Sequence, residues 1–213
     1  MKTKIYNLII LDESGSMKRI KKETINGFNE TIQTIKVAQK EHENQEHFIT
    51  LVTFNGSGLK VVYDKVRSEN TVELSEELYR PDCNTPLFDA IGMSVTSLRH
   101  FLLDQTEYTV LVTIITDGEE NASKEYKGEL IKEMIGELKQ KGWIFTYIGA
   151  NHDVAKFAIN ISIESYMEYA SDSEGTSAMN QKNSSTRKRA YDRLAEGFTG
   201  SSLNVGFFSE DTP

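Results

Sequence analysis

Residues 7–17 read NLIILDESGSM, an apolar run that ends in one acid and two hydroxyl residues. An apolar run without polar alternation is typical of a strand that is buried on both faces, as in a parallel sheet. Asp12, Ser14 and Ser16 then occupy every second position directly after the run. The stretch therefore predicts an interior strand near residues 4–11 that presents three oxygen-bearing side chains where it ends.

Other parts of the chain have the same alternation of strands and helices. Unbroken apolar runs predict two more buried strands, at residues 110–115 and 143–148. Apolar residues at helical spacing predict three helices, at residues 25–35, 87–102 and 130–138. This order predicts an α/β fold, a Rossmann-like three-layer sandwich with a mostly parallel central sheet of about six strands and helices on both faces.

The sheet should have one antiparallel member at its edge. Segments 48–54 and 59–63 flank the turn NGSG and predict a hairpin. The later part of the chain predicts a short helix, a last strand and a last helix, which begin near residues 153, 165 and 176. We expect one domain over residues 1–195 and a flexible C-terminal tail over residues 196–213, where Gly, Ser and acids prevail.

Composition narrows the function. The chain has 213 residues and a net charge of −8, which argues against nucleic acid as a partner. The one basic cluster, residues 187–189, is interpreted as a solvated helix face. A single cysteine, Cys83, excludes an internal disulfide, and it is interpreted as a packed small residue. With neither a signal-peptide pattern nor a membrane-length apolar run, we expect a cytoplasmic protein without membrane association.

Polar residues collect where the strands end, which is where open α/β sheets bind ligands. Asp12 follows the first run, Asp117 follows the run at residues 110–115 in TIITDGEEN, and Thr85 precedes Pro86 in DCNTPLFDAI. Each motif alone has an ordinary explanation as a turn or a helix cap. In particular, Thr85 would cap a helix whose first residue is Pro86.

Together the motifs indicate a metal site. Two Ser, one Thr and two Asp are the hard oxygen donors that Mg²⁺ prefers. Alternate side chains of an extended loop point to one side, so Asp12, Ser14 and Ser16 should converge, with Gly15 permitting a tight path. We expect Mg²⁺ here, with Mn²⁺ or Ca²⁺ as alternatives.

The set DESGS, then Thr85, then TDG resembles the von Willebrand factor A (VWA) domain and its metal-ion-dependent adhesion site (MIDAS). The resemblance covers roughly residues 4–170. It implies that three hydroxyl groups touch the metal, while two carboxylates act largely through water. The full metal set is then Asp12, Ser14, Ser16, Thr85 and Asp117.

The resemblance also implies a function. A VWA domain of this kind is a binding module and not an enzyme, because its metal takes an acidic side chain of a partner protein as a ligand. Partner binding in the family moves the last helix. The likeness is strongest to bacterial cytoplasmic VWA proteins, some of which belong with chaperone-type ATPases or with tellurium-resistance and other stress-resistance systems. These are the expected classes of partner.

Two alternatives stay open. A Mg²⁺-dependent phosphohydrolase of the haloacid dehalogenase type also has an Asp after its first strand, but its second acid is replaced here by Ser14 and the general acid–base is missing. A structural VWA domain with a non-functional metal site would not need to keep every hydroxyl. Glu119 and Glu120 are interpreted as a solvated rim or as groups that repel an acidic partner, and His152 as a solvated loop residue.

Overall fold

The structure, a computed structural model, describes residues 2–203, 207 and 208. The strands are β1 (Thr3–Asp12), β2 (Gln45–Asn55), β3 (Gly58–Arg67), β4 (Tyr108–Thr116), β5 (Ile144–Gly149) and β6 (Tyr166–Glu168). The main helices are α1 (Lys21–Glu41), α2 (Leu87–Phe101), α3 (Gly128–Gln140), α4 (Val154–Asn160) and α5 (Ser173–Ala195).

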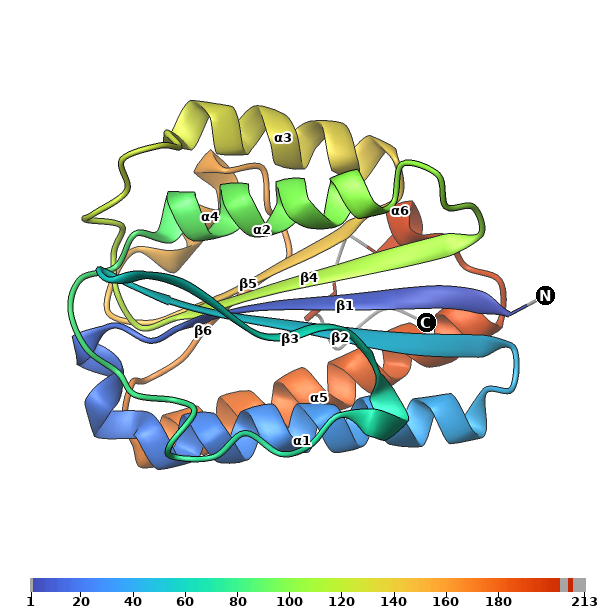
Figure 1. Cartoon of the computed structure of the whole chain (residues 1–213), viewed down its shortest axis with the longest axis horizontal. Helices are drawn as coiled ribbons and strands as arrows, with labels where there is room; N and C mark the ends of the chain where they lie inside the picture. Colours follow the sequence, from blue (N-terminus) through green and yellow to red (C-terminus); the bar gives the residue numbers. More distant parts are fainter. Residues whose placement is uncertain (1, 204–206, 209–213) are drawn as a thin grey trace.

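These elements form three layers, as predicted. The six strands lie in the order β3-β2-β1-β4-β5-β6. Helices α1 and α5 cover one face of the sheet, and α2, α3 and α4 lie on the other (Figure 1). The predicted Rossmann-like sandwich is therefore confirmed.

Strand β1 lies in the interior of the sheet, parallel to β2 on one side and to β4 on the other. All its residues from Ile5 to Asp12 are buried. Because helices cover both faces here, apolar side chains are favoured at every position of the strand. The prediction made from the unbroken apolar run is confirmed.

Alternate residues of β1 enter two separate cores, because successive side chains of a strand point to opposite faces. Ile9 and Leu11 pack on the side of α1 and α5. Leu8 and Ile10 pack on the side of α2 and α3. The strand thus ends at Asp12 with an apolar core packed against each of its faces.

The hairpin of β2 and β3 supplies the antiparallel edge. Asn55 pairs with Gly58 at its tip, and Gly58 has a φ of +129°, which a residue with a side chain rarely adopts. Every other strand pair in the described sheet is parallel. The predicted single antiparallel edge strand is confirmed.

Helix α5 packs differently from the other helices, since much of its buried face is polar. Arg187 is fully buried, and its guanidinium donates to Thr113 Oγ1 at 2.6 Å and to Tyr191 OH at 3.2 Å. The interpretation of residues 187–189 as a solvated face is therefore wrong for Arg187, although Arg189 is exposed. A long side chain at the inward position of a helix reaches the sheet whatever its polarity.

A glycine allows α5 to approach α1 closely. A Cβ atom at Gly27 would lie 2.0 Å from the side chain of Asn180, so only glycine fits at this crossing. Asn180 in turn donates from Nδ2 to the Glu23 carbonyl oxygen at 3.0 Å. The two long helices are joined by polar contacts at a distance that a larger residue would prevent.

Part of the chain after residue 195 packs against the domain. A short helix, α6 (Gly200–Leu203), follows α5, and Leu203, Phe207 and Phe208 are buried. The rest of the expected tail, residues 204–206 and 209–213, lies outside the described residues. The boundary at residue 195 stays a prediction, but three apolar side chains beyond it belong to the core on the α1–α5 side.

Candidate metal-binding site

The predicted site residues lie at the carboxyl ends of β1 and β4. Leu11 pairs with Ile115 in the parallel register, so Asp12 and Asp117 leave the sheet side by side. The chain proceeds from β1 to β2 in one direction, whereas β4, β5 and β6 extend in the other. The site therefore occupies the point where strand order reverses, which is where open α/β sheets bind ligands.

Asp12 is completely buried and fully hydrogen-bonded. Its Oδ1 accepts from the Ser14 backbone N–H at 2.7 Å, and its Oδ2 accepts from Thr116 Oγ1 at 2.6 Å. Burial raises the pKa of Asp12 to about 6, while the hydrogen bonds from Thr116 and Ser14 act in the opposite direction. The carboxylate holds the loop in position from behind.

The two serines lie together on the loop, as their spacing predicts. Ser14 Oγ and Ser16 Oγ are 3.2 Å apart. Ser16 Oγ donates to Asp117 Oδ1 at 2.5 Å and thereby joins the loop after β1 to the loop after β4. Ser14 is buried and Ser16 exposed, so the pair extends from the interior to the surface.

Thr85 comes from a distant part of the chain to the same place. A Cβ atom at Gly118 would lie 3.6 Å from Thr85 Oγ1 and 3.8 Å from Ser16 Oγ, so both hydroxyls face the space beside this glycine. The Thr85 backbone is tied to the same loop, since its N–H donates to Asn121 Oδ1 at 2.9 Å. All five predicted site residues therefore meet at one end of the sheet.

The predicted capping role of Thr85 is wrong. Helix α2 begins at Leu87, with Pro86 preceding it, and neither residue provides a side-chain cap. The free N–H groups of the helix are bonded by the loop after β4: Glu120 Oε2 accepts from the Phe88 N–H at 2.8 Å. The capping residue lies more than 30 positions from the helix start, so it could not be identified from the residues next to the helix in the sequence.

Glu119 and Glu120, the two acids beside the site, differ in their surroundings. Glu120 is not a solvated rim residue, because its Oε1 also accepts from the N–H groups of Ala122 and Ser123, at 2.8 and 2.7 Å. Glu119 is exposed, as expected for a rim. One of the two acids is therefore a structural residue of the loop.

Three further residues hold the site and were not predicted. Arg19 Nη2 lies 3.4 Å from Asp117 Oδ2, and Ser171 Oγ donates to the same oxygen at 3.1 Å. Glu13 is buried and forms an ion pair with Lys60 at 3.0 Å. Glu13 lies within the DESGS motif, Arg19 follows the motif, and Ser171 follows the last strand, so polarity near a strand end was the available signal.

Glu13 positions the loop that carries Thr85. Its carboxylate accepts from the Arg80 N–H, and its carbonyl oxygen accepts from the Asp82 N–H at 2.8 Å. The Gly15 N–H donates to the Cys83 carbonyl oxygen at 2.9 Å. The segment before Thr85 is thus bonded along its length to the DESGS loop.

Two neighbouring residues differ from their sequence interpretation. His152 is half-buried and not solvated: its Nδ1 bonds to the Ala150 carbonyl oxygen at 2.7 Å and its Nε2 to Tyr147 OH at 2.9 Å. Cys83 is exposed and not packed, with a φ of +62°. Both ring nitrogens of His152 are occupied, so it cannot act as a base toward the serines.

The donor set fits a hard divalent cation. Asp117, whose side chain is fully buried, already accepts from Ser16, Arg19 and Ser171, so both carboxylates are bonded within the protein. The serine and threonine hydroxyls lie in front of them and supply neutral oxygen ligands. Mg²⁺, Mn²⁺ and Ca²⁺ all accept such ligands.

The hydrogen-bond partners of the site hydroxyls bear on a serine-hydrolase mechanism. Among the described residues, no histidine or lysine bonds to the hydroxyl of Ser14, Ser16 or Thr85. A serine nucleophile needs such a base within hydrogen-bonding distance. Ser16 donates instead to Asp117, a carboxylate that is also held by Arg19 and Ser171.

Solved structures share the fold. The SpRpn10 VWA domain matches with a TM-score of 0.54 and 9% identity, over 84% of this chain and 94% of that chain. The PilB minor pilin from Streptococcus sanguinis matches with a TM-score of 0.57 and 16% identity, over 90% of this chain and 63% of that chain. The pilus adhesin SpaC from Lactobacillus rhamnosus GG, in an open conformation, matches with a TM-score of 0.61 and 13% identity, over 94% of this chain and 31% of that chain.

These similarities establish a VWA-like fold and nothing finer. This chain spans less than two thirds of the PilB and SpaC structures. No protein-family model matches the sequence, and no curated protein matches it. Among the described helices, none is both long enough and apolar enough to cross a membrane.

Proposed function

We propose that this protein is a metal-dependent protein-binding module with a MIDAS-type site. Ser14, Ser16 and Thr85 would hold a divalent cation, with Asp12 and Asp117 behind them. The single observation that carries the proposal is that these hydroxyls gather in front of two carboxylates whose oxygens are already bonded within the protein. A VWA-like fold suggests a protein-interaction module, which agrees with this assignment.

The chain's own residues determine what the site can attract. The Asp12 and Asp117 side chains are both buried, and hydroxyl and N–H groups of the protein donate to their carboxylates. Their negative charge is therefore partly satisfied by the protein. A Mg²⁺ ion, when bound, would supply an electrophilic centre that accepts an acidic side chain from a partner. Mn²⁺ or Ca²⁺ would serve the same purpose.

The proposed partner is a protein that presents an Asp or Glu, in the class of chaperone-type ATPases or stress-resistance complexes. Nucleic acid is not proposed, because the net charge of −8 opposes phosphate binding. We propose a cytoplasmic location on the basis of the single cysteine, Cys83. The likeness to pilus proteins concerns the fold.

Two alternatives are less well supported. A phosphohydrolase of the haloacid dehalogenase type would need a second acid where Ser14 stands, and the structural neighbours include a VWA domain and pilus proteins. A VWA domain with a non-functional site would have no reason to bond Thr85 so closely to the loop after β4. That bonding, through Asn121, favours a working site.

Calorimetry with Mg²⁺ on the wild type and on Asp117→Ala tests the metal site. We expect the substitution to abolish Mg²⁺ binding, because it removes the acceptor that orients Ser16. Glu119→Ala is the matched control, since Glu119 is an exposed acid two residues away that takes no part in the bonding. Circular dichroism checks that both variants fold. Equal Mg²⁺ affinity in Asp117→Ala and the wild type would overturn the assignment.

Partner capture is tested separately, by retention on immobilised protein with Mg²⁺ and with EDTA. A true partner should be retained by the wild type only when Mg²⁺ is present, and Asp12→Ala should not retain it. If the same protein were retained in EDTA and by Asp12→Ala, the metal would have no role in recognition.

A further inference from the structure

A second cluster of metal-ligating side chains lies where α1 and α5 end, far from the hydroxyl site. Helix α1 begins beside the DESGS loop and has 21 residues, so its far end is about 30 Å away. Glu41 is its last residue and His42 follows it. Asp192 lies in the last turn of α5, which runs beside α1 (Figure 1).

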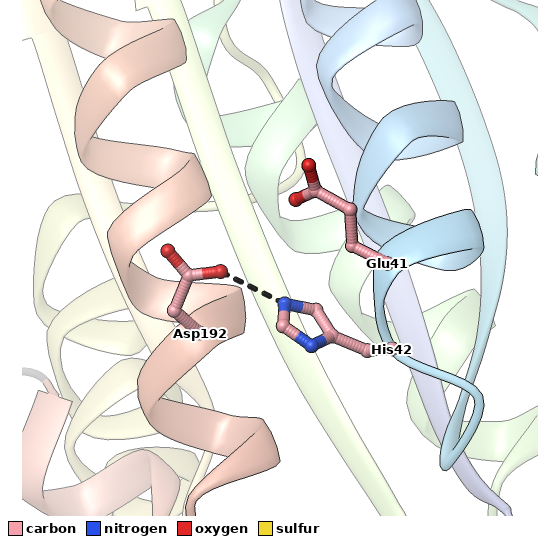
Figure 2. Close-up of side chains that lie close together, drawn as sticks. All are labelled: Glu41, His42 and Asp192. Atoms are coloured by element: carbon pink, nitrogen blue, oxygen red, sulfur yellow. Dashed lines mark hydrogen bonds and ion pairs between the residues drawn. The ribbon is translucent and has the colours of Figure 1, made fainter.

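The three side chains already have a common centre. Each offers one ligand atom, and these atoms all lie within 4.8 Å of one another. His42 Nε2 is 2.8 Å from Asp192 Oδ1, and Figure 2 shows the imidazole directed at this carboxylate from the α1 side. The His42 backbone is fixed, because its N–H donates to the Ala38 carbonyl oxygen at 2.9 Å.

The cluster attracts a cation in the described structure. Lys188 Nζ donates to Glu41 Oε2 at 2.6 Å and lies 3.5 Å from Asp192 Oδ1. The hydrogen bond to Glu41 raises the pKa of Lys188. Both helices also end here, and helix carboxyl ends carry partial negative charge that favours a cation. The field that holds the ammonium group would hold a metal ion as well.

We propose that Glu41, His42 and Asp192 form a binding site for Zn²⁺. One imidazole and two carboxylates suit Zn²⁺, whereas the hydroxyl site offers only oxygen. The ion would replace the proton between His42 Nε2 and Asp192. This proton passes to solvent when the imidazole is charged and to Nδ1, by way of water, when it is neutral. The ion would also displace the Lys188 ammonium group into solvent. Water would complete the tetrahedral set.

The movements required are small and fall on mobile side chains. Tetrahedral Zn²⁺ with ligands at about 2.0–2.2 Å places ligand atoms about 3.3 Å apart. Glu41 is exposed and can rotate inward, while the His42 side chain is only 18% exposed and needs little change. Lys188 is 45% exposed at the side chain and can turn into solvent.

Such a site would clamp the carboxyl end of α5 to α1. The contacts that join these ends in the absence of metal are polar and partly exposed, which makes them individually weak. A metal ion shared between the helices would bind the folded state and not the unfolded chain, so Zn²⁺ should raise thermal stability. This consequence does not depend on the hydroxyl site.

The test uses Asp117→Ala as the background, in excess Mg²⁺, so that the hydroxyl site does not contribute. In calorimetry we expect one Zn²⁺ per chain and an increase in Tm. Adding His42→Ala should weaken Zn²⁺ binding about tenfold or more, because even indirect metal partners contribute that much. Adding His100→Ala, an exposed histidine outside the cluster, should change nothing.

Lys188→Met separates a metal site from a simple ion-pair cluster. Removing the competing ammonium should tighten Zn²⁺ binding, whereas a merely structural cluster gives no such gain. Asp192→Asn replaces His42→Ala if the latter does not fold, and it should also weaken binding. Zn²⁺ affinity that is unchanged in both the histidine and the aspartate variants would overturn the proposal, as would unchanged or weaker binding in Lys188→Met.

Discussion

Asp12 on β1 and Thr116 on β4 face each other across neighbouring strands, and the Thr116 hydroxyl donates to Asp12 Oδ2 at 2.6 Å. This bond is completely buried. A carboxylate inside a protein is tolerated when its oxygens are hydrogen-bonded, and Asp12 has one donor on each oxygen. The neighbouring strand therefore determines whether Asp12 can stay ionised.

Thr116→Val should destabilise the protein by about 1–3 kcal/mol at pH 7, because it removes a donor from a buried carboxylate without changing the shape of the side chain. The loss should be smaller at pH 5, where Asp12, with its pKa raised to about 6, is mostly protonated. Urea unfolding at both pH values measures it. Thr53→Val is the control, since its buried hydroxyl has no partner within residues 2–203, 207 and 208; a similar loss there would contradict the explanation.

Ionisation of Asp12 should lower the stability of the folded protein as pH rises. Its folded pKa, about 6, exceeds the ordinary value of 3.8, so the stability it contributes is complete below pH 3.8 and is lost as pH rises through 6. Without metal, the stability of Asp12→Asn relative to the wild type should therefore increase by about 1 kcal/mol between pH 5 and pH 7. Chemical unfolding at the two pH values gives the difference. A constant difference would show that Asp12 does not titrate in this range.

His47 should act in the opposite direction over the same range. Burial, together with repulsion from His42 and Arg187, lowers the pKa of His47 to about 3. Because the unfolded imidazole takes up its proton near pH 6.5, stability is lost as pH falls below that value, by about 2 kcal/mol at pH 5. His47→Gln should lose less stability between pH 7 and pH 5 than the wild type. An identical pH profile in the variant would exclude His47 as the cause.

Arg187 contacts no acid among the described residues, and its Nε has no partner there. A buried charge of this kind returns little of its desolvation cost, so Arg187→Met should leave stability unchanged or raise it by about 1 kcal/mol. Arg187→Ala should cost about 2–4 kcal/mol, because it leaves a cavity. Thermal unfolding of the wild type and of the two variants measures these changes in stability. Equal losses in the two variants would show that the guanidinium bonds themselves are needed.

The strand frame and the positions of the site residues were predictable from sequence, because both follow from local patterns. An unbroken apolar run identifies β1, and a polar residue at the end of such a run must emerge at the sheet edge, as Asp12 and Asp117 do. The buried face of α5 was not predictable in the same way. Its contacts depend on Gly27, which is more than 150 positions away from Asn180 and brings the helices together.

The helix cap was mispredicted for a related reason. A local reading gives the role to Thr85, whereas Glu120 performs it from another loop. Long-range hydrogen bonds leave no periodic signal in a single sequence. The same limit applies to Arg19 and Ser171, which reach Asp117 from either end of the domain.

The bond from Glu120 to α2 has a consequence for how the site works as a receptor. Thr85 lies two residues before α2, and Glu120 lies three residues after Asp117, so the cap joins the two halves of the site before any ligand arrives. The loss of conformational freedom needed to align them occurs during folding. Binding of a metal ion should therefore require little ordering of the chain. A rigid site of this kind should also discriminate between ions that differ only in size or charge.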